Sequence, residues 1–517
     1  MRLAGLVGAA LTLARPALGA QVPDSASFRL MSGGDTVIDE RVTRTANELR
    51  GEFADRVRGG RMTYEATLGP GGLVTRLAMR HYRSVSDTAG DRASFVIGGD
   101  SIIARMGRAA PAHLPGKAGV VAMINPSAAF IEQVIVRARA LGGDGAVIPV
   151  FIVGAPEVIG ATVTWVGQDS ATLEYAGVTM RLAVTPDGRV LGGTVPAQRV
   201  RIVRGRWTTP IRAVARDYSA PPGAPYTAED VVVRTPAGLR LTGTLTIPRG
   251  RVNGRAPAVV TITGSGPEDR DEEPPSLPGY RPFRELADTL GRRGIAVLRL
   301  DDRGMNGSDA GGRDATSVDF ADDVRAGVAY LRTRPEIDGD RIALVGHSEG
   351  AIIAPMVAAT DPRLRAIVLM AGTASPGREI LRAQQRYAVD SMQRLAGAAR
   401  DSALARAERA TAAAASTPWM RFFLDDDPSV RARQVKTPVL ILQGETDRQV
   451  PPSEADKLAA AFRAGGNTRI TVRRFPETDH LFVADASGGF DYTKLRSLHV
   501  RREVLGSIAD WLVARFR

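Results

Sequence analysis

The sequence contains no cysteine among its 517 residues. This absence excludes disulfide bonds, thiolate nucleophiles, iron–sulfur clusters, cysteine-based zinc sites and an N-terminal lipid-modified cysteine. Histidine is also scarce, and its five copies are scattered, so they form no ligand cluster for a metal. We therefore expect an activity that needs neither a metal nor a cofactor.

Long apolar runs and blocks of like charge are missing as well. No stretch of eighteen uninterrupted apolar residues follows the N-terminus, which argues against an integral membrane segment in the mature chain. The net charge is +12, but lysine is rare and the arginines are spread along the chain without a run of five basic residues. This pattern favours a protein that binds no nucleic acid, with a polyanion-binding surface as the alternative.

The composition that remains is that of a soluble globular protein. Apolar residues make up 44% of the chain and charged residues 24%, and the length suits two or three domains. At the N-terminus a short basic start precedes an apolar stretch over residues 3–14, followed by small residues at 17, 19 and 20. We predict a signal peptide over residues 1–20 with an open cleavage position, and hence a periplasmic or secreted protein. A buried N-terminal helix is the alternative.

Residues 21–215 are predicted to form an antiparallel β-rich domain. Short alternating runs are separated by glycine-rich turns, and one helix is expected over residues 127–141. His81 and His113 lie here as isolated residues that we interpret as surface or packing side chains. The domain carries no catalytic motif, and access control, polymer binding and an oligomer contact all remain open as its role.

A proline-rich linker at residues 216–225 leads into a region of different character, residues 226–517. Short apolar strands alternate there with amphipathic helices, which predicts a doubly wound, mostly parallel α/β sheet covered on both faces. Residues 375–435 contain no strand pattern and are rich in alanine and arginine. We predict a helical insertion that acts as a lid.

Within this region Gly346, Ser348 and Gly350 form a G-x-S-x-G motif between a predicted strand and a predicted helix. Such a turn exposes the serine above the sheet, and the flanking glycines permit its sharpness. The serine needs a base and an acid, which follow it in the order Asp, His. Only His480 and His499 lie beyond the motif, and His480 directly follows a strand-like segment, so we choose it and interpret His499 as structural.

The catalytic acid and the oxyanion donors are also expected in loops that follow predicted strands. Asp447 lies in the loop after the strand at 439–442 and is our candidate acid, with Glu445 as the alternative. The glycine-rich turn at 263–267 lies after another strand, so we expect the backbone N–H groups of Ser265 and Glu349 to bind the oxyanion. A simple glycine turn is the alternative reading of this segment.

Together these residues resemble a known family. Residues 226–517 are similar to bacterial α/β-hydrolases of the esterase, thioesterase and serine-peptidase-like superfamily. The motifs that carry the resemblance are Gly-Ser-Gly-Pro-Glu-Asp-Arg-Asp at 264–271, Asp-Asp-Arg-Gly at 301–304, Gly-His-Ser-Glu-Gly at 346–350 and Pro-Trp-Met-Arg-Phe-Phe at 418–423. The chain departs from the family at Asn306 and Ala351, where relatives usually carry glycine.

The resemblance implies an α/β-hydrolase fold and a serine hydrolase that acts on a small acyl substrate through an acyl-enzyme. It favours carboxylic esters or thioesters, and the predicted export favours esters because coenzyme A thioesters are intracellular compounds. A peptidase related to the prolyl oligopeptidases is the alternative, although the β-rich domain lacks the repeats of a propeller. A non-enzymatic binding protein on the same scaffold is a third reading.

Overall fold

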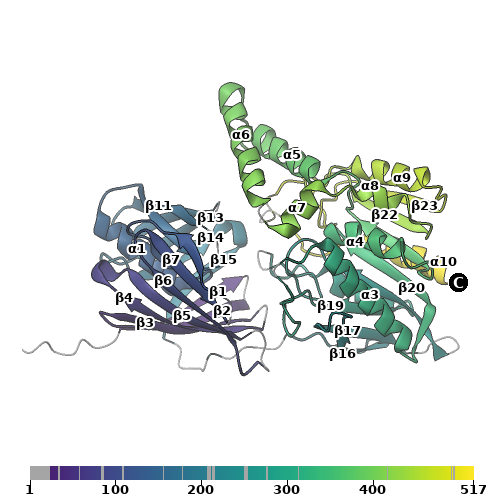
Figure 1. The fold of residues 1–517 in the computed structure, drawn as a ribbon, viewed down its shortest axis with the longest axis horizontal. Helices are drawn as coiled ribbons and strands as arrows, with labels where there is room; N and C mark the ends of the chain where they lie inside the picture. The colour runs from purple at the N-terminus through teal and green to yellow at the C-terminus, as the bar shows by residue number, and fades with distance from the viewer. Residues whose placement is uncertain are drawn as a thin grey trace, which may run out of the picture.

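The computed structural model describes residues 24–517 apart from 33–34, 57–58, 83–86, 108–109, 155–156, 177, 207–210, 212–215, 250–253, 275–276, 313, 416, 491 and 493–494. The predicted signal peptide at residues 1–20 lies outside this range. Two lobes stand next to each other (Figure 1), a β-rich lobe ending near residue 205 and an α/β lobe beginning near residue 226.

The N-terminal lobe is built on one 15-stranded sheet in the order β8-β7-β6-β5-β4-β3-β2-β1-β15-β14-β13-β12-β11-β10-β9. All neighbours are antiparallel except β9 and β10. The strands are β1 (Asp24–Ser32), β2 (Asp35–Arg44), β3 (Glu48–Asp55), β4 (Arg61–Leu68), β5 (Val74–Tyr82), β6 (Asp91–Ile97), β7 (Ser101–Met106), β8 (Ala112–Pro115), β9 (Val121–Met123), β10 (Ala146–Ile152), β11 (Val158–Val166), β12 (Ser170–Tyr175), β13 (Val178–Val184), β14 (Val190–Val195) and β15 (Val200–Gly205).

Helix α1 (Ala128–Leu141) lies against this sheet and shares a single hydrophobic core with strands from both of its halves (Figure 1). The sequence prediction placed this helix over residues 127–141, and Ser127 is its N-cap, since the side chain accepts from the Phe130 N–H. The buried carboxylate of Glu40 accepts from the Ala128 N–H at 2.7 Å and from the Tyr64 hydroxyl at 2.8 Å. The helix N-terminus therefore has acceptors although it is buried.

The second lobe contains an eight-stranded sheet in the order β16-β17-β19-β18-β20-β21-β22-β23. The pairs β16–β17 and β17–β19 are antiparallel and the others are parallel. The strands are β16 (Tyr226–Arg234), β17 (Arg240–Pro248), β18 (Ala256–Ile262), β19 (Ala296–Leu300), β20 (Ile337–His347), β21 (Ala366–Met370), β22 (Val439–Gly444) and β23 (Ile470–Phe475). The predicted fold class, a mostly parallel α/β sheet preceded by a β-rich domain, is confirmed.

Helices cover both faces of this sheet and enclose two hydrophobic cores. Helices α3 (Ser317–Thr333), α4 (Glu349–Ala358) and α9 (Glu454–Ala464) bury apolar residues on one face, and α2 (Pro282–Gly291) and α10 (Arg502–Phe516) on the other. Because both faces are buried, the central strands are almost wholly apolar, as parallel strands in covered sheets are.

The segment between β21 and β22 is helical, as predicted. It comprises α5 (Gly377–Tyr387), a π-helical turn (Ala388–Met392), α6 (Gly397–Ala414), α7 (Pro418–Asp425) and α8 (Pro428–Ala432). Helices α5 and α6 project beyond the sheet in Figure 1, whereas α7 returns toward it. None of the helices in the described residues is long and apolar enough to cross a membrane.

Candidate active site

Ser348 occupies the turn between β20 and α4, and its backbone is strained. Its φ of 53° and ψ of −114° lie in a region that non-glycine residues rarely adopt. The turn is also tightly packed, because a Cβ on Gly346 would lie 2.1 Å from the Gly350 carbonyl oxygen, and one on Gly350 would lie 2.1 Å from that of Ile262. Both glycines are therefore required by close backbone approach, which is the geometry of a nucleophile elbow.

Asp447 and His480 meet in loops at the carboxyl ends of neighbouring strands. Asp447 follows β22, His480 follows β23, and Asp447 Oδ2 lies 2.9 Å from His480 Nδ1. The Asp447 carboxylate is fully buried and also accepts from the backbone N–H groups of Gln449 and Val450, each at 2.8 Å. These contacts fix the carboxylate so that it orients the imidazole ring with Nε2 facing away from it.

Ser348 and His480 line one cavity of about 370 Å³, which we call the catalytic cavity. The predicted oxyanion donors Ser265 and Glu349 line it too, so four of the predicted site residues line the same cavity. The fifth, Asp447, is hydrogen-bonded to His480. Within the described residues the only hydrogen bond of the His480 ring is the one to Asp447, which leaves Nε2 for a substrate or for Ser348. Helices α5 and α7 cover the cavity with Ile380, Leu381, Gln384, Trp419, Met420 and Phe423.

The alternative residues considered for these roles lie elsewhere. Glu445 is exposed, and the His480 ring pairs with Asp447 instead. His499 is largely exposed, and its Nδ1 lies 2.9 Å from Glu285 Oε1 on α2. His81 on β5 and His113 on β8 belong to the N-terminal sheet, away from this cavity.

A buried pair that the sequence reasoning missed lies beneath the elbow. Glu272 Oε1 lies 2.7 Å from Nδ1 of His347 and accepts from the Gly264 N–H at 2.8 Å. The other ring nitrogen of His347 lies 2.9 Å from the His480 carbonyl oxygen. Burial by itself would lower the pKa of His347, but the adjacent Glu272 carboxylate raises it above its usual value. This pair connects the oxyanion segment, the elbow and the histidine loop.

Acidic groups with raised pKa values border the same cavity. Burial, together with the nearby carboxylates of Glu272 and Asp302, raises the pKa of Glu268. Burial also raises the pKa of Glu349, although Ser317 and Trp419 donate hydrogen bonds to it at 2.6 and 2.9 Å. Buried groups with perturbed pKa values that lie in a cleft are characteristic of functional sites.

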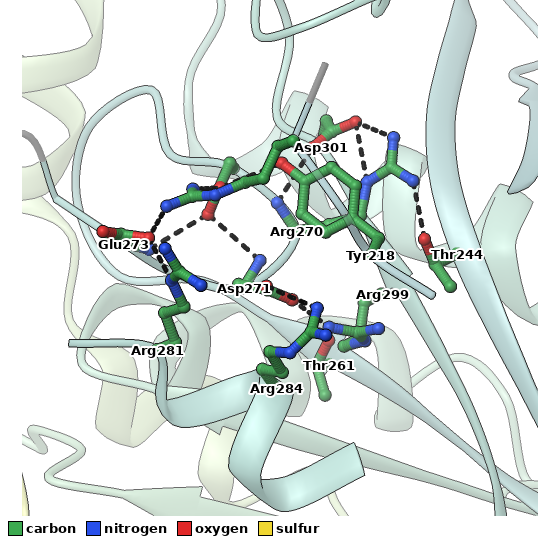
Figure 2. Close-up of polar contacts among 12 residues, drawn as sticks. Tyr218, Thr244, Thr261, Arg270, Asp271, Glu273, Arg281, Arg284, Arg299 and Asp301 are labelled. Atoms are coloured by element: carbon green, nitrogen blue, oxygen red, sulfur yellow. Dashed lines mark hydrogen bonds and ion pairs between the residues drawn. The ribbon is translucent and has the colours of Figure 1, made fainter. Parts of the chain in front are cut away.

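The segment at 264–273 is held to the sheet by a buried network of ion pairs (Figure 2). Arg270 binds Asp301 (Nη2–Oδ2, 2.6 Å) and the Thr244 hydroxyl, and Arg299 on β19 binds Asp271. From the linker, Arg216 pairs with Asp269 and Glu273, and the Tyr218 hydroxyl donates to Asp269 at 3.0 Å. The linker between the two lobes is thus attached directly to the segment that carries Ser265.

One of the two departures from the family pattern, Asn306, has a local explanation. Asn306 adopts a φ of 45°, a region that asparagine tolerates better than most residues. Its side-chain amide donates to Asp301 at 2.7 Å, so it joins the same network. Ala351 is buried at the start of α4, where its Cβ lies close to Gly372.

Comparison with known proteins identifies relatives of the second lobe. Residues 283–498 match the Prolyl oligopeptidase family. Esterase EstD of Thermotoga maritima is 26% identical over 284 residues, which cover 53% of this chain and 65% of that protein. An uncharacterized protein of Mycobacterium tuberculosis is 31% identical over 237 residues, which cover 45% of this chain and 66% of that protein.

These matches therefore span slightly less than two thirds of the relatives' own length. Among solved structures, the Pyrococcus furiosus esterase Pf2001 aligns with 58% of this chain and 94% of its own, at 16% identity and a TM-score of 0.41.

Proposed function

We propose that the chain, whose second lobe has an α/β-hydrolase fold and whose residues 283–498 match the Prolyl oligopeptidase family, is an exported serine hydrolase that cleaves carboxylic esters through an acyl-enzyme. One observation carries the proposal. Ser348, strained at its strand–helix turn, shares a cavity with His480, whose ring is bound to the buried Asp447 carboxylate.

The chemistry follows from these positions. Ser348 Oγ attacks the ester carbonyl carbon while His480 Nε2 takes the hydroxyl proton, and Asp447 stabilises the imidazolium that forms. The backbone N–H groups of Ser265 and Glu349 bind the oxyanion, and each donor contributes roughly 10²–10³ in rate. His480 then protonates the departing alcohol. In the second half a water molecule, deprotonated by His480, releases the acid and restores Ser348.

The family match favours one second candidate, a serine peptidase that uses the same three side chains. The N-terminal lobe argues against the architecture of a prolyl oligopeptidase with a propeller, because its described strands form a single sheet in nearly sequential order. A thioesterase would use the same residues. Turnover of aminoacyl or peptidyl amides, or of acyl thioesters, in preference to p-nitrophenyl esters would replace the ester assignment.

The experiment is covalent labelling with a fluorophosphonate, combined with p-nitrophenyl ester turnover. Wild type should be labelled, and Ser348→Ala should lose both label and turnover. His480→Ala should lose at least about 10³-fold in kcat. His499→Ala is the matched control, because its ring also pairs with a carboxylate but lies outside the catalytic cavity. An unlabelled, folded wild type would favour the non-enzymatic reading.

Export remains part of the proposal and rests on the basic and apolar start of the chain. Cell fractionation of the native host, with N-terminal sequencing of the recovered protein, tests it. A product that begins near residue 21 in the periplasm or the medium would support it, whereas an intact N-terminus in the cytoplasm would refute it.

A further inference from the structure

A second cavity, of about 490 Å³, lies directly beside the catalytic cavity. We call it the side cavity. Gly264, Glu349 and Trp419 line both spaces. The shared wall adjoins the nucleophile, because a Cβ on Gly264 would lie 3.5 Å from the Ser348 Cβ. On α4 the consecutive residues Ile352 and Ile353 line the catalytic and the side cavity respectively.

The side cavity offers a mainly apolar surface. Strands β18 and β19 and helices α3 and α4 contribute Val260, Ile262, Leu300, Phe320, Val324 and Ile353. Its charged lining groups already have polar partners within the protein, and Glu349 accepts from the Ser317 hydroxyl and the Trp419 indole. Arg303 pairs with Asp323 at 2.6 Å, and Asp302 accepts from the Thr263 hydroxyl and the Glu268 N–H. A ligand in the side cavity would therefore contact mainly hydrocarbon side chains, and a polar group on that ligand would find few free partners.

The position of His480 decides which part of an ester enters which cavity. The general acid must reach the oxygen of the departing alcohol, and His480 lines the catalytic cavity but not the side cavity. The alcohol therefore leaves through the catalytic cavity. With the carbonyl oxygen at the Ser265 and Glu349 amides, the acyl chain extends to the other side of the carbonyl carbon, toward the shared wall.

We propose that the side cavity binds the acyl chain, and that the substrates are esters of apolar acids of medium length. This inference rests on the proposed function. Trp419 forms the lid side of the wall, where its indole N–H donates to Glu349 and its ring stacks on Phe423 with 5° between the planes. The indole thus borders the path along which the chain passes from one cavity to the other.

The test measures kcat/KM for p-nitrophenyl acetate, butyrate, hexanoate, octanoate and decanoate. In wild type the value should rise with chain length up to about the octanoate, by up to about fourfold per buried methylene. Ala315 is half-buried in the loop before α3 and lines the side cavity, so Ala315→Phe places a ring in that cavity. It should lower octanoate turnover at least tenfold and change acetate turnover less than threefold. Val324→Phe fills the same cavity from α3 and provides a second variant.

The matched control is Leu381→Phe, which fills the catalytic cavity from α5. It should change the preference among acetate esters of different alcohols and leave the acyl-length profile intact. An unchanged profile in both folded side-cavity variants, a wild type that prefers acetate, or a profile shifted by Leu381→Phe would overturn the inference alone. A wild type that neither labels with fluorophosphonate nor hydrolyses any ester would instead remove the proposed function, and this inference with it.

Discussion

The buried Glu272 carboxylate provides the most informative single perturbation. Its side chain is 3% exposed, and one oxygen holds both the Gly264 N–H and the His347 ring. Glu272→Gln keeps an acceptor of the same shape but removes the charge. Glu272→Ala removes the acceptor and leaves both donors buried without it.

The magnitudes follow from the kind of bond lost. A hydrogen bond to a charged group contributes about 1.5–3 kcal/mol and a neutral one about 0.5–1.5 kcal/mol, so Glu272→Gln should lower the free energy of unfolding by about 1–3 kcal/mol. Glu272→Ala should cost about 3–5 kcal/mol, because it removes one partner of a buried pair. Glu272→Ala also frees the Gly264 N–H, and Gly264 directly precedes the oxyanion donor Ser265. The kcat of this variant should therefore fall roughly 10–10²-fold with little change in KM.

The pH dependence gives a signature that mere packing would not produce. The pKa of His347 is raised in the folded protein, so its pairing with Glu272 stabilises the fold fully below the ordinary value of about 6.5. That stabilisation is lost as the pH rises through the raised pKa. The difference in unfolding free energy between wild type and Glu272→Gln, measured by urea denaturation, should therefore shrink between pH 6 and pH 9.

A second Glu–His pair, whose histidine is exposed and whose Glu285 is half-buried, provides the control. Glu285 also binds a histidine, His499, but the histidine is exposed, so Glu285→Gln should cost less than about 1 kcal/mol and leave kcat unchanged. The reasoning is refuted if Glu272→Ala costs no more than Glu285→Gln, or if the Glu272→Gln deficit grows with pH.

Three further variants test other parts of the site. Burial raises the pKa of Asp479 to about 7, so wild type should lose stability as the pH rises from 4 to 8, by at most about 4 kcal/mol, and Asp479→Asn should flatten that loss in thermal melts. Gly350→Ala places a Cβ 2.1 Å from the Ile262 carbonyl oxygen and should abolish labelling even in any fraction that stays folded by circular dichroism. Arg216→Ala removes one partner from each of two buried carboxylates, Asp269 and Glu273, which keep Tyr218 and Arg281 respectively, so the α/β lobe should lose about 3 kcal/mol in urea denaturation; a loss below about 1 kcal/mol would contradict the pairing.

The period and composition of apolar residues in the sequence were sufficient to predict the fold class of the α/β lobe and its buried strands. The buried strands and the helix faces follow from period and composition, and the helix predicted at 127–141 begins at its Ser127 cap. The order of strands could not be predicted by pattern alone, because β19 lies between β17 and β18 through pairing that no local signal specifies. Likewise the alternation in residues 21–215 indicated strands but not that all fifteen form one sheet.

Within the site, motif spacing and the scarcity of histidine were enough to select Ser348, Asp447 and His480; Ser348 and His480 line one cavity, and Asp447 pairs with His480. Glu272 and the arginine network could not be predicted, because a carboxylate that binds a backbone amide and a ring far along the chain leaves no periodic pattern in the sequence. The one available signal was the dense run of charge at 268–273, five acidic residues and one arginine, which is unusual for a segment that proves to be largely buried. Charged residues become buried there because Arg216 and Arg299 pair with acidic residues of the segment and Asp301 pairs with its Arg270.

The pairing of β1 with β15 has a consequence for how the first lobe is assembled. These two strands sit at the middle of the sheet, flanked by two runs in which each strand pairs with its neighbour in sequence. Within each run the strands pair through contacts that are short-range in sequence, which form fast and can form during synthesis. The β1–β15 pairing, which we call the seam, joins the two runs and can form only after residues 200–205 have been synthesised. Deleting either seam strand should therefore split the sheet into two separate meanders rather than trim its edge.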